Sequence, residues 1–125
     1  MTLITGVGSA ENWEEHRTEQ GPPMTVVREL PPGRHIDLPG RGTTFVREAE
    51  GPVGAPALLL LHGWTANADL NWSTAYGALA ERYRLVALDH RGHARGIRAQ
   101  APFRLEDCAD DAAALVEHLG LGPVI

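Results

Sequence analysis

Residues 57–64 read ALLLLHGW, and residues 85–93 read LVALDHRGH. Each stretch is an apolar run without polar alternation that ends in a turn containing histidine and glycine. A continuous apolar run of this length is typical of a strand covered on both faces, as in the middle of a parallel sheet. Residues 57–61 and 85–88 are therefore predicted to be buried strands with helices above and below them.

Between these two runs, apolar residues recur at helical spacing and predict one crossover helix, so that the whole segment is a βαβ unit. These residues are Trp72, Tyr76, Leu79, Ala80 and Tyr83. A last helix is predicted further on, where an apolar stripe faces away from acidic residues and Gly120 supplies a C-terminal stop. The stripe consists of Leu105, Cys108, Ala109, Ala112, Leu115, Val116 and Leu119.

The first part of the chain is divided by turns. Residues 1–23 have no sustained periodicity and end in Gly-Pro-Pro, which predicts a poorly ordered lead-in to a domain at 24–125. Within that domain, turns rich in glycine and proline separate three predicted extended segments, at residues 25–30, 34–38 and 43–49.

The end of the sequence coincides with the start of a predicted strand at residues 123–125. A parallel strand at the centre of a sheet is among the best-buried elements of a fold. We therefore expect the chain to be truncated at the start of its fifth core strand.

Composition indicates a globular protein without a nucleic-acid or membrane partner. Of the 125 residues, 43% are hydrophobic and 22% are charged, with a net charge of −5. Nucleic acids and anionic membranes require clustered cations, which are absent from the sequence. No stretch reaches the ~18 apolar residues of a membrane span, and no signal peptide is recognisable. Cytoplasmic localisation is expected.

The first turn resembles that of the α/β-hydrolase fold family, in which a His-Gly pair ends a core strand and the next backbone N–H helps to form the oxyanion hole. The resemblance places His62 and Gly63 in the supporting turn and assigns the oxyanion-hole N–H to Trp64. Gly63 is expected to permit a tight turn. The implied fold is the N-terminal half of an α/β-hydrolase, with a mostly parallel sheet and flanking helices.

The second turn resembles the Asp-x-Arg-Gly-x-Gly turn of the same family. The resemblance implies that Asp89, Arg91 and Gly92 support the site through hydrogen bonds and do not take part in catalysis. The sequence departs from the pattern at Ala94, where glycine is usual, and at Gly96, where serine is common. A slightly different path is expected for this loop.

No nucleophile elbow is present in the sequence. The family pattern Gly-x-Ser-x-Gly follows the fifth strand, and the only serines, Ser9 and Ser73, lie in other contexts. The triad acid and histidine follow the nucleophile in chain order. We therefore expect no catalytic residue in this chain, which should be inactive alone. The implied parent is a serine esterase or lipase-like hydrolase that acts on a small-molecule ester or related carbonyl and needs no cofactor.

Two alternatives remain open. The parent could use an Asp nucleophile, as epoxide hydrolases and dehalogenases do, although Thr65 disfavours the epoxide-hydrolase branch, where proline is common. The chain could also be a non-enzymatic interaction module that keeps half of the fold and pairs an open strand edge with another polypeptide.

Other motifs have simpler interpretations. His90 and His93 are three residues apart but lie on a predicted turn with Asp89 as the only adjacent acid, so no metal site is predicted. Residues 6–8, GVG, lack the third glycine and the preceding strand of a dinucleotide-binding fingerprint. Cys108, the only cysteine, lies on an apolar stripe and is predicted to be a core residue.

Overall fold

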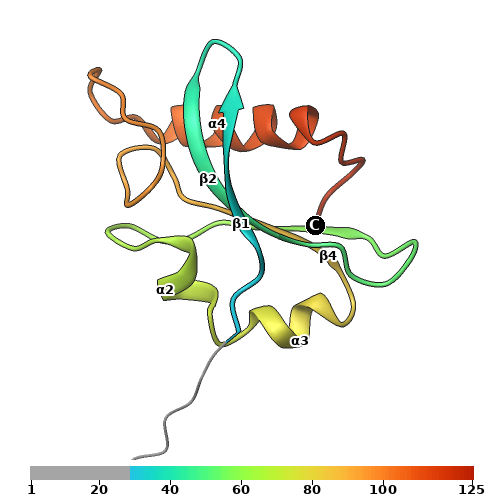
Figure 1. The fold of residues 1–125 in the computed structure, drawn as a ribbon. Helices are drawn as coiled ribbons and strands as arrows, with labels where there is room; N and C mark the ends of the chain where they lie inside the picture. Colours follow the sequence, from blue (N-terminus) through green and yellow to red (C-terminus); the bar gives the residue numbers. More distant parts are fainter. Residues whose placement is uncertain (1–28) are drawn as a thin grey trace, which may run out of the picture.

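The computed structural model describes residues 29–125, which form one mixed sheet with helices on both faces (Figure 1). The α/β fold class predicted from the sequence is confirmed, but within residues 29–125 the sheet is mixed and not mostly parallel as expected. In the order β1-β2-β4-β3, the four strands are β1 (Gly33–Leu38), β2 (Gly42–Ala49), β4 (Arg84–Leu88) and β3 (Ala57–Leu60). Helix α4 (Leu105–His118) covers one face, while α2 (Ala68–Trp72) and α3 (Tyr76–Ala80) cover the other.

Strand pairing separates an antiparallel part from a parallel part. β1 and β2 form an antiparallel hairpin, and β2 also pairs antiparallel with β4. β3 and β4 are parallel, which confirms the predicted βαβ unit. The predicted strand start at residues 123–125 is present as a parallel bridge between Ala57 and Val124, and Ile125 hydrogen-bonds to Ala57 and Leu59. β3 therefore has a neighbour on each side.

The predictions for the N-terminal part can be compared only from residue 29 onward. The segments predicted at 34–38 and 43–49 are β1 and β2, each one residue longer at its start. The predicted lead-in at 1–23, the GVG motif at 6–8 and residues 25–28 of the first predicted segment lie outside the described residues. Glu29 and Leu30, which end that segment, are not in a strand.

The core consists of two apolar layers, one on each face of the sheet. β4 lies between them, because Val86 and Leu88 point to the α4 side while Leu85 and Ala87 point to the other. All four side chains are almost completely buried. Burial of alternate residues on opposite faces explains why the strand reads as an unbroken apolar run.

The single crossover helix predicted between β3 and β4 is wrong. Two short helices replace it, with a turn at residues 73–75 in which the Ala75 N–H bonds to the Trp72 carbonyl, at an N···O distance of 2.8 Å. A hydrogen bond to the carbonyl three residues earlier is of the 3₁₀ type, which winds the backbone more tightly than an α-helix does. The step from Trp72 to Tyr76 spans the turn and keeps helical spacing, so periodicity alone could not reveal the break.

The last helix has the predicted bounds but not the predicted faces. Leu105, placed on the apolar stripe, is 74% exposed, and Ala109 is also exposed. Asp111, expected among the solvated acids, is 1% exposed. It lies three residues after Cys108 and four before Leu115, which puts it on the buried stripe. The helix ends as predicted, with Gly120 at φ +59°.

In the loop between β2 and β3, Gly51 lies close to the backbone at the start of β4, and substitutions in this loop can test that contact. Gly51 and Gly54 both have positive φ, at +65° and +76°. A Cβ on Gly51 would lie 2.2 Å from the Tyr83 carbonyl oxygen, whereas a Cβ on Gly54 would meet no atom within 4 Å. We expect Gly51→Ala to lower the free energy of unfolding by about 3 kcal/mol. The control Gly54→Ala should cost only about 1 kcal/mol, from backbone strain. Equal losses in urea denaturation would contradict this packing.

Candidate active site

The turn after β3 is built around the buried side chain of His62, which is 6% exposed. The His90 N–H donates to Nε2 of His62, with 2.8 Å between the two nitrogens. Nε2 is therefore an acceptor, so Nδ1 carries the proton and donates to the Gly63 carbonyl oxygen, 2.8 Å away. His62 thus connects the ends of β3 and β4.

The two peptide groups on either side of Gly63 have different partners. The Gly63 N–H donates to Oδ1 of Asn71 at 2.7 Å, and the Gly63 carbonyl also accepts from the Ala66 N–H at 3.4 Å. Because the described peptide bonds are all trans, the Trp64 N–H points opposite to the Gly63 carbonyl, away from His62. Within residues 29–125, the Trp64 N–H has no hydrogen-bond partner.

The expectation that Gly63 supplies the conformational freedom of this turn is wrong. Its φ lies outside the left-handed region, and an added Cβ would meet only Oδ1 of Asn71, at 3.6 Å. Thr65 is the residue with positive φ, at +57°. Proline fixes φ near −65° and cannot adopt this conformation. The absence of proline at position 65 therefore has a conformational reason.

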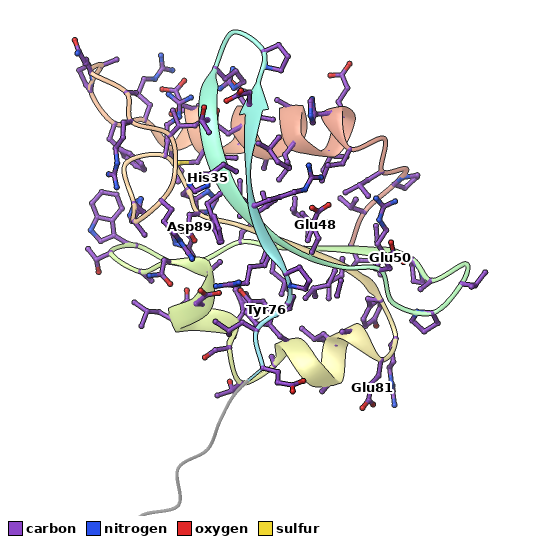
Figure 2. The ribbon with its side chains drawn as sticks, viewed as in Figure 1. His35, Glu48, Glu50, Tyr76, Glu81 and Asp89 are labelled. Carbon is purple, nitrogen blue, oxygen red and sulfur yellow. The ribbon has the colours of Figure 1, made fainter. Side chains whose placement is uncertain are left out.

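Asp89 lies at the end of β4, beside the loop that leads to α2 (Figure 2). It is completely buried. Its Oδ1 accepts from the Ala68 N–H at 2.9 Å, and its Oδ2 accepts from Nε of Arg95 at 2.8 Å and from the Arg95 N–H at 3.3 Å. Thr44 donates its hydroxyl to the Asp89 carbonyl at 2.9 Å. One residue thus fastens the start of α2, strand β2 and the loop after β4.

Arg91 connects the same loop to α4. Its guanidinium donates twice to the Asp111 carboxylate, with both distances 2.7 Å, and Arg41 donates to that carboxylate at 2.7 Å. Burial pushes the pKa of Asp111 upward, but the hydrogen bonds from Arg91 and Arg41 outweigh it, so the pKa lies below its usual value. Gly92 has φ +73° and closes the loop through its N–H to the Ile97 carbonyl at 2.9 Å.

Both departures from the family's turn pattern are accommodated by the backbone. Ala94 adopts a positive φ of +37°, although it is not glycine. A Cβ on Gly96 would lie 2.0 Å from the His90 carbonyl oxygen. Serine therefore cannot occupy position 96 along this path, which explains the glycine there.

A second group of charges, which sequence reasoning missed, is centred on Asp69 of α2. Arg47 donates to both carboxylate oxygens, at 2.6 and 2.8 Å, and Arg95 and the Tyr76 hydroxyl each donate at 3.2 Å. Burial raises the pKa of Asp69, but the hydrogen bonds from Arg47 lower it by more, so the pKa lies below its usual value. Burial and the neighbouring carboxylate raise the pKa of Tyr76.

The Trp64 side chain is 70% exposed but contacts two neighbouring rings. Its ring makes edge-to-face contacts with His93 and Phe103, at centroid distances of 5.3 and 5.1 Å. His90 lies 4.5 Å from His62 between ring centroids. Burial lowers the pKa of His90, and the neighbouring imidazoles of His62 and His93 add to this effect. The neutral imidazole of His90 is therefore favoured.

The described residues contain neither a metal-binding cluster nor a membrane-spanning helix, and Cys108 and Ser73 both lie in or next to helices. Among residues 29–125, no three His, Cys, Asp or Glu side chains are placed to hold a metal ion. In the same part of the chain, no helix is long and apolar enough to cross a membrane. Cys108 is buried in α4, and burial raises the pKa of its thiol. Ser73 directly follows α2, and Ser9 lies outside the described residues.

The chain belongs to the α/β-hydrolase fold family, because the family model described as "alpha/beta hydrolase fold" matches residues 56–125. A bifunctional esterase/perhydrolase of Acinetobacter calcoaceticus is 39% identical over 72 residues, covering 57% of this chain and 26% of that protein. A 2-(acetamidomethylene)succinate hydrolase of Mesorhizobium japonicum is 33% identical over 92 residues, covering 74% of this chain and 31% of that protein.

Solved structures show the same relationship. The crystal structure of E-2-(acetamidomethylene)succinate hydrolase matches with a TM-score of 0.65 at 30% identity, over 74% of this chain and 33% of that one. A haloalkane dehalogenase from Bradyrhizobium elkanii matches with the same TM-score at 27% identity, over 74% and 31% of the two chains. The chain thus spans about a quarter to a third of the length of these relatives.

The depressed pKa of Asp111 predicts how stability depends on pH. A carboxylate with a lower pKa in the folded state than in the unfolded state contributes fully above its unfolded pKa of about 4, and its contribution is lost as the pH falls through the folded value. We expect the free energy of unfolding to fall between about pH 5 and pH 2. Asp111→Asn should make this fall shallower and cost about 3 kcal/mol at pH 7, because two guanidinium groups lose their anion.

Asp110→Asn provides the matched control for this experiment, because Asp110 is exposed on the same helix. It should leave both the stability at pH 7 and its dependence on pH unchanged. If urea denaturation shows that Asp111→Asn loses as much free energy of unfolding in acid as the unmodified protein does, Asp111 is not the group that makes stability depend on pH.

Proposed function

We propose that this chain supplies an oxyanion-hole donor to an α/β-fold hydrolase that acts on an ester or a related carbonyl compound. The Trp64 N–H carries this proposal. In the turn after β3, the Gly63 N–H is bonded to Asn71 and the Ala66 N–H to Gly63, whereas the Trp64 N–H has no partner among the described residues. A free backbone donor at this position of the family fold is suited to bind a developing negative charge.

The proposed chemistry is acyl transfer. A nucleophile attacks the carbonyl carbon, the C=O electron pair moves to oxygen, and the resulting oxyanion accepts a hydrogen bond from the Trp64 N–H. When the C=O bond re-forms, the ester C–O bond breaks and the alkoxide leaves as the alcohol after taking up a proton; water then releases the acyl group as the acid. One donor of this kind contributes on the order of 3 kcal/mol to transition-state stabilisation. The second donor would be the N–H after a nucleophilic serine, as in the family elbow. The related esterase/perhydrolase and 2-(acetamidomethylene)succinate hydrolase support a small carbonyl-containing substrate.

The nucleophile and the other triad residues would come from a part of the protein that follows Ile125. The sequence contains no Gly-x-Ser-x-Gly pattern, and it spans only about a quarter to a third of its relatives. We therefore infer that residues 24–125 are a partial α/β-hydrolase domain that is inactive alone. A cytoplasmic location and a reaction without cofactor complete the proposal.

A second candidate function is hydrolysis through an Asp nucleophile, supported by the similarity to a haloalkane dehalogenase. The positive φ of Thr65 gives no support to the epoxide-hydrolase branch, since proline could not adopt it. The non-enzymatic interaction module has less support, because the outer edge of β3 already bonds to Ile125 at two points.

The oxyanion assignment predicts a large loss of kcat for one substitution of Trp64 and almost none for another. Trp64→Pro removes the backbone N–H and should lower kcat for p-nitrophenyl acetate by about 100- to 1000-fold in the complete protein, with little change in KM. Trp64→Phe keeps the N–H and should retain kcat within a few fold. Near-normal kcat in Trp64→Pro would rule out the assignment.

The nucleophile can be identified with a fluorophosphonate probe, which reacts covalently with an activated serine. We expect one adduct per complete protein by intact mass, and none after heat denaturation. Hydrolysis of a haloalkane without labelling would favour an Asp nucleophile. Neither labelling nor hydrolysis would favour the interaction module.

A further inference from the structure

We propose that Asn71 is a positioning residue for the oxyanion donor, which it holds in place through the Gly63 N–H. The inference rests on the proposed function of the Trp64 N–H. Asn71 itself does not contact that N–H. Its Oδ1 accepts from the Gly63 N–H at 2.7 Å, one peptide group before the proposed donor.

Helix α2 provides a fixed base for this contact. The Asn67 side chain caps the helix by accepting from the Leu70 N–H at 2.8 Å, and the buried Asp89 accepts from the Ala68 N–H at 2.9 Å. Both bonds hold the first turn of the helix. Side chains that project from α2 therefore start from a defined position next to the end of β3.

Two adjacent residues of α2 hold the strand end on either side of His62. The Trp72 indole N–H donates to the Leu61 carbonyl at 3.2 Å, and Asn71 accepts from the Gly63 N–H. The orientation of the Asn71 amide follows, because a backbone N–H can only donate and so requires the oxygen. The residue is exposed, and its bond is not part of the buried core.

Asn71 matters because it restrains a glycine. Glycine has the widest backbone freedom of any residue, and only the Asn71 oxygen would come within 4 Å of a Cβ at position 63. The Gly63 carbonyl is held by His62 at 2.8 Å, and the Gly63 N–H by Asn71. With both groups engaged, the peptide group that carries the Trp64 N–H has a defined direction. Without the Asn71 contact, the Gly63 N–H is no longer held, and the backbone at Gly63 can rotate more freely.

Loss of positioning should reduce kcat more than substrate binding. A displaced donor stabilises the oxyanion less, whereas the surface that binds substrate is unchanged. For Asn71→Ala in the complete protein, we expect kcat for p-nitrophenyl acetate to fall about tenfold, with KM within about twofold. Leu70→Ala is the matched control, because Leu70 is the adjacent residue and is 72% exposed. Its kinetic constants should not change.

A second measurement does not depend on activity. Hydrogen exchange of the Gly63 amide, followed by NMR, should be at least tenfold faster in Asn71→Ala than in the unmodified protein or Leu70→Ala. Asn71→Asp keeps an acceptor oxygen and should restore slow exchange. A merely structural effect of the substitution would instead speed exchange throughout α2 in step with lower stability.

The outcomes separate this inference from the proposed function. If the unmodified protein hydrolyses the ester and Asn71→Ala keeps its kcat, Asn71 has no positioning role, although the oxyanion assignment stands. If kcat falls while Gly63 exchange is unchanged, Asn71 acts directly and the inference is wrong. If the unmodified protein shows neither hydrolysis nor fluorophosphonate labelling, the proposed function fails and this inference with it.

Discussion

The candidate site depends on the buried carboxylate of Asp89. A charge completely removed from water is tolerated only when paired and hydrogen-bonded, and removing one partner of such a pair typically costs about 3–5 kcal/mol. Asp89 meets this requirement with the Ala68 N–H on one oxygen and Arg95 on the other. The end of β4, the start of α2 and the loop after β4 therefore cannot move independently without exposing or unpairing the charge.

The loop that begins at Asp89 extends this constraint to both faces of the sheet. Helices α4 and α2 lie on opposite faces of the sheet (Figure 1). Arg91 pairs with Asp111 of α4, and Arg95 pairs with Asp69 of α2. Asp69 in turn binds Arg47 of β2. Two arginines four residues apart on one loop thus connect helices on opposite sides of the sheet. The loop between these two arginines also takes a tight path, with no room for a Cβ on Gly96.

Sequence reasoning succeeded where burial leaves a pattern. β4 is buried on both faces and its sequence is an unbroken apolar run, from which the fold class followed. The prediction of a buried strand at residues 57–61 was only partly right, because Leu60 is buried whereas Leu61 follows β3 and is 44% exposed. Sequence reasoning failed where one contact outweighs a pattern. Asp111 lies on the buried stripe of α4 because two arginines distant in sequence neutralise it, and the break between α2 and α3 preserves helical spacing. The bond from the Gly63 N–H to Asn71 leaves no trace in the sequence, since one side chain binding a backbone group has no periodicity.

The arrangement around His62 bears on the strength of the proposed donor as well as on its direction. His62 accepts from the His90 N–H and donates to the Gly63 carbonyl, so a continuous chain of hydrogen bonds runs from the end of β4 to the peptide group that carries the Trp64 N–H. Hydrogen bonds in series polarise one another, by about 10–30% per bond. A carbonyl that accepts a bond draws charge from its own peptide nitrogen and makes the N–H a better donor. A backbone donor contributes most to catalysis when the bonds that hold it do not have to reorganise as charge develops on an oxyanion, and fixed bonds on both sides of the Gly63 carbonyl favour that condition.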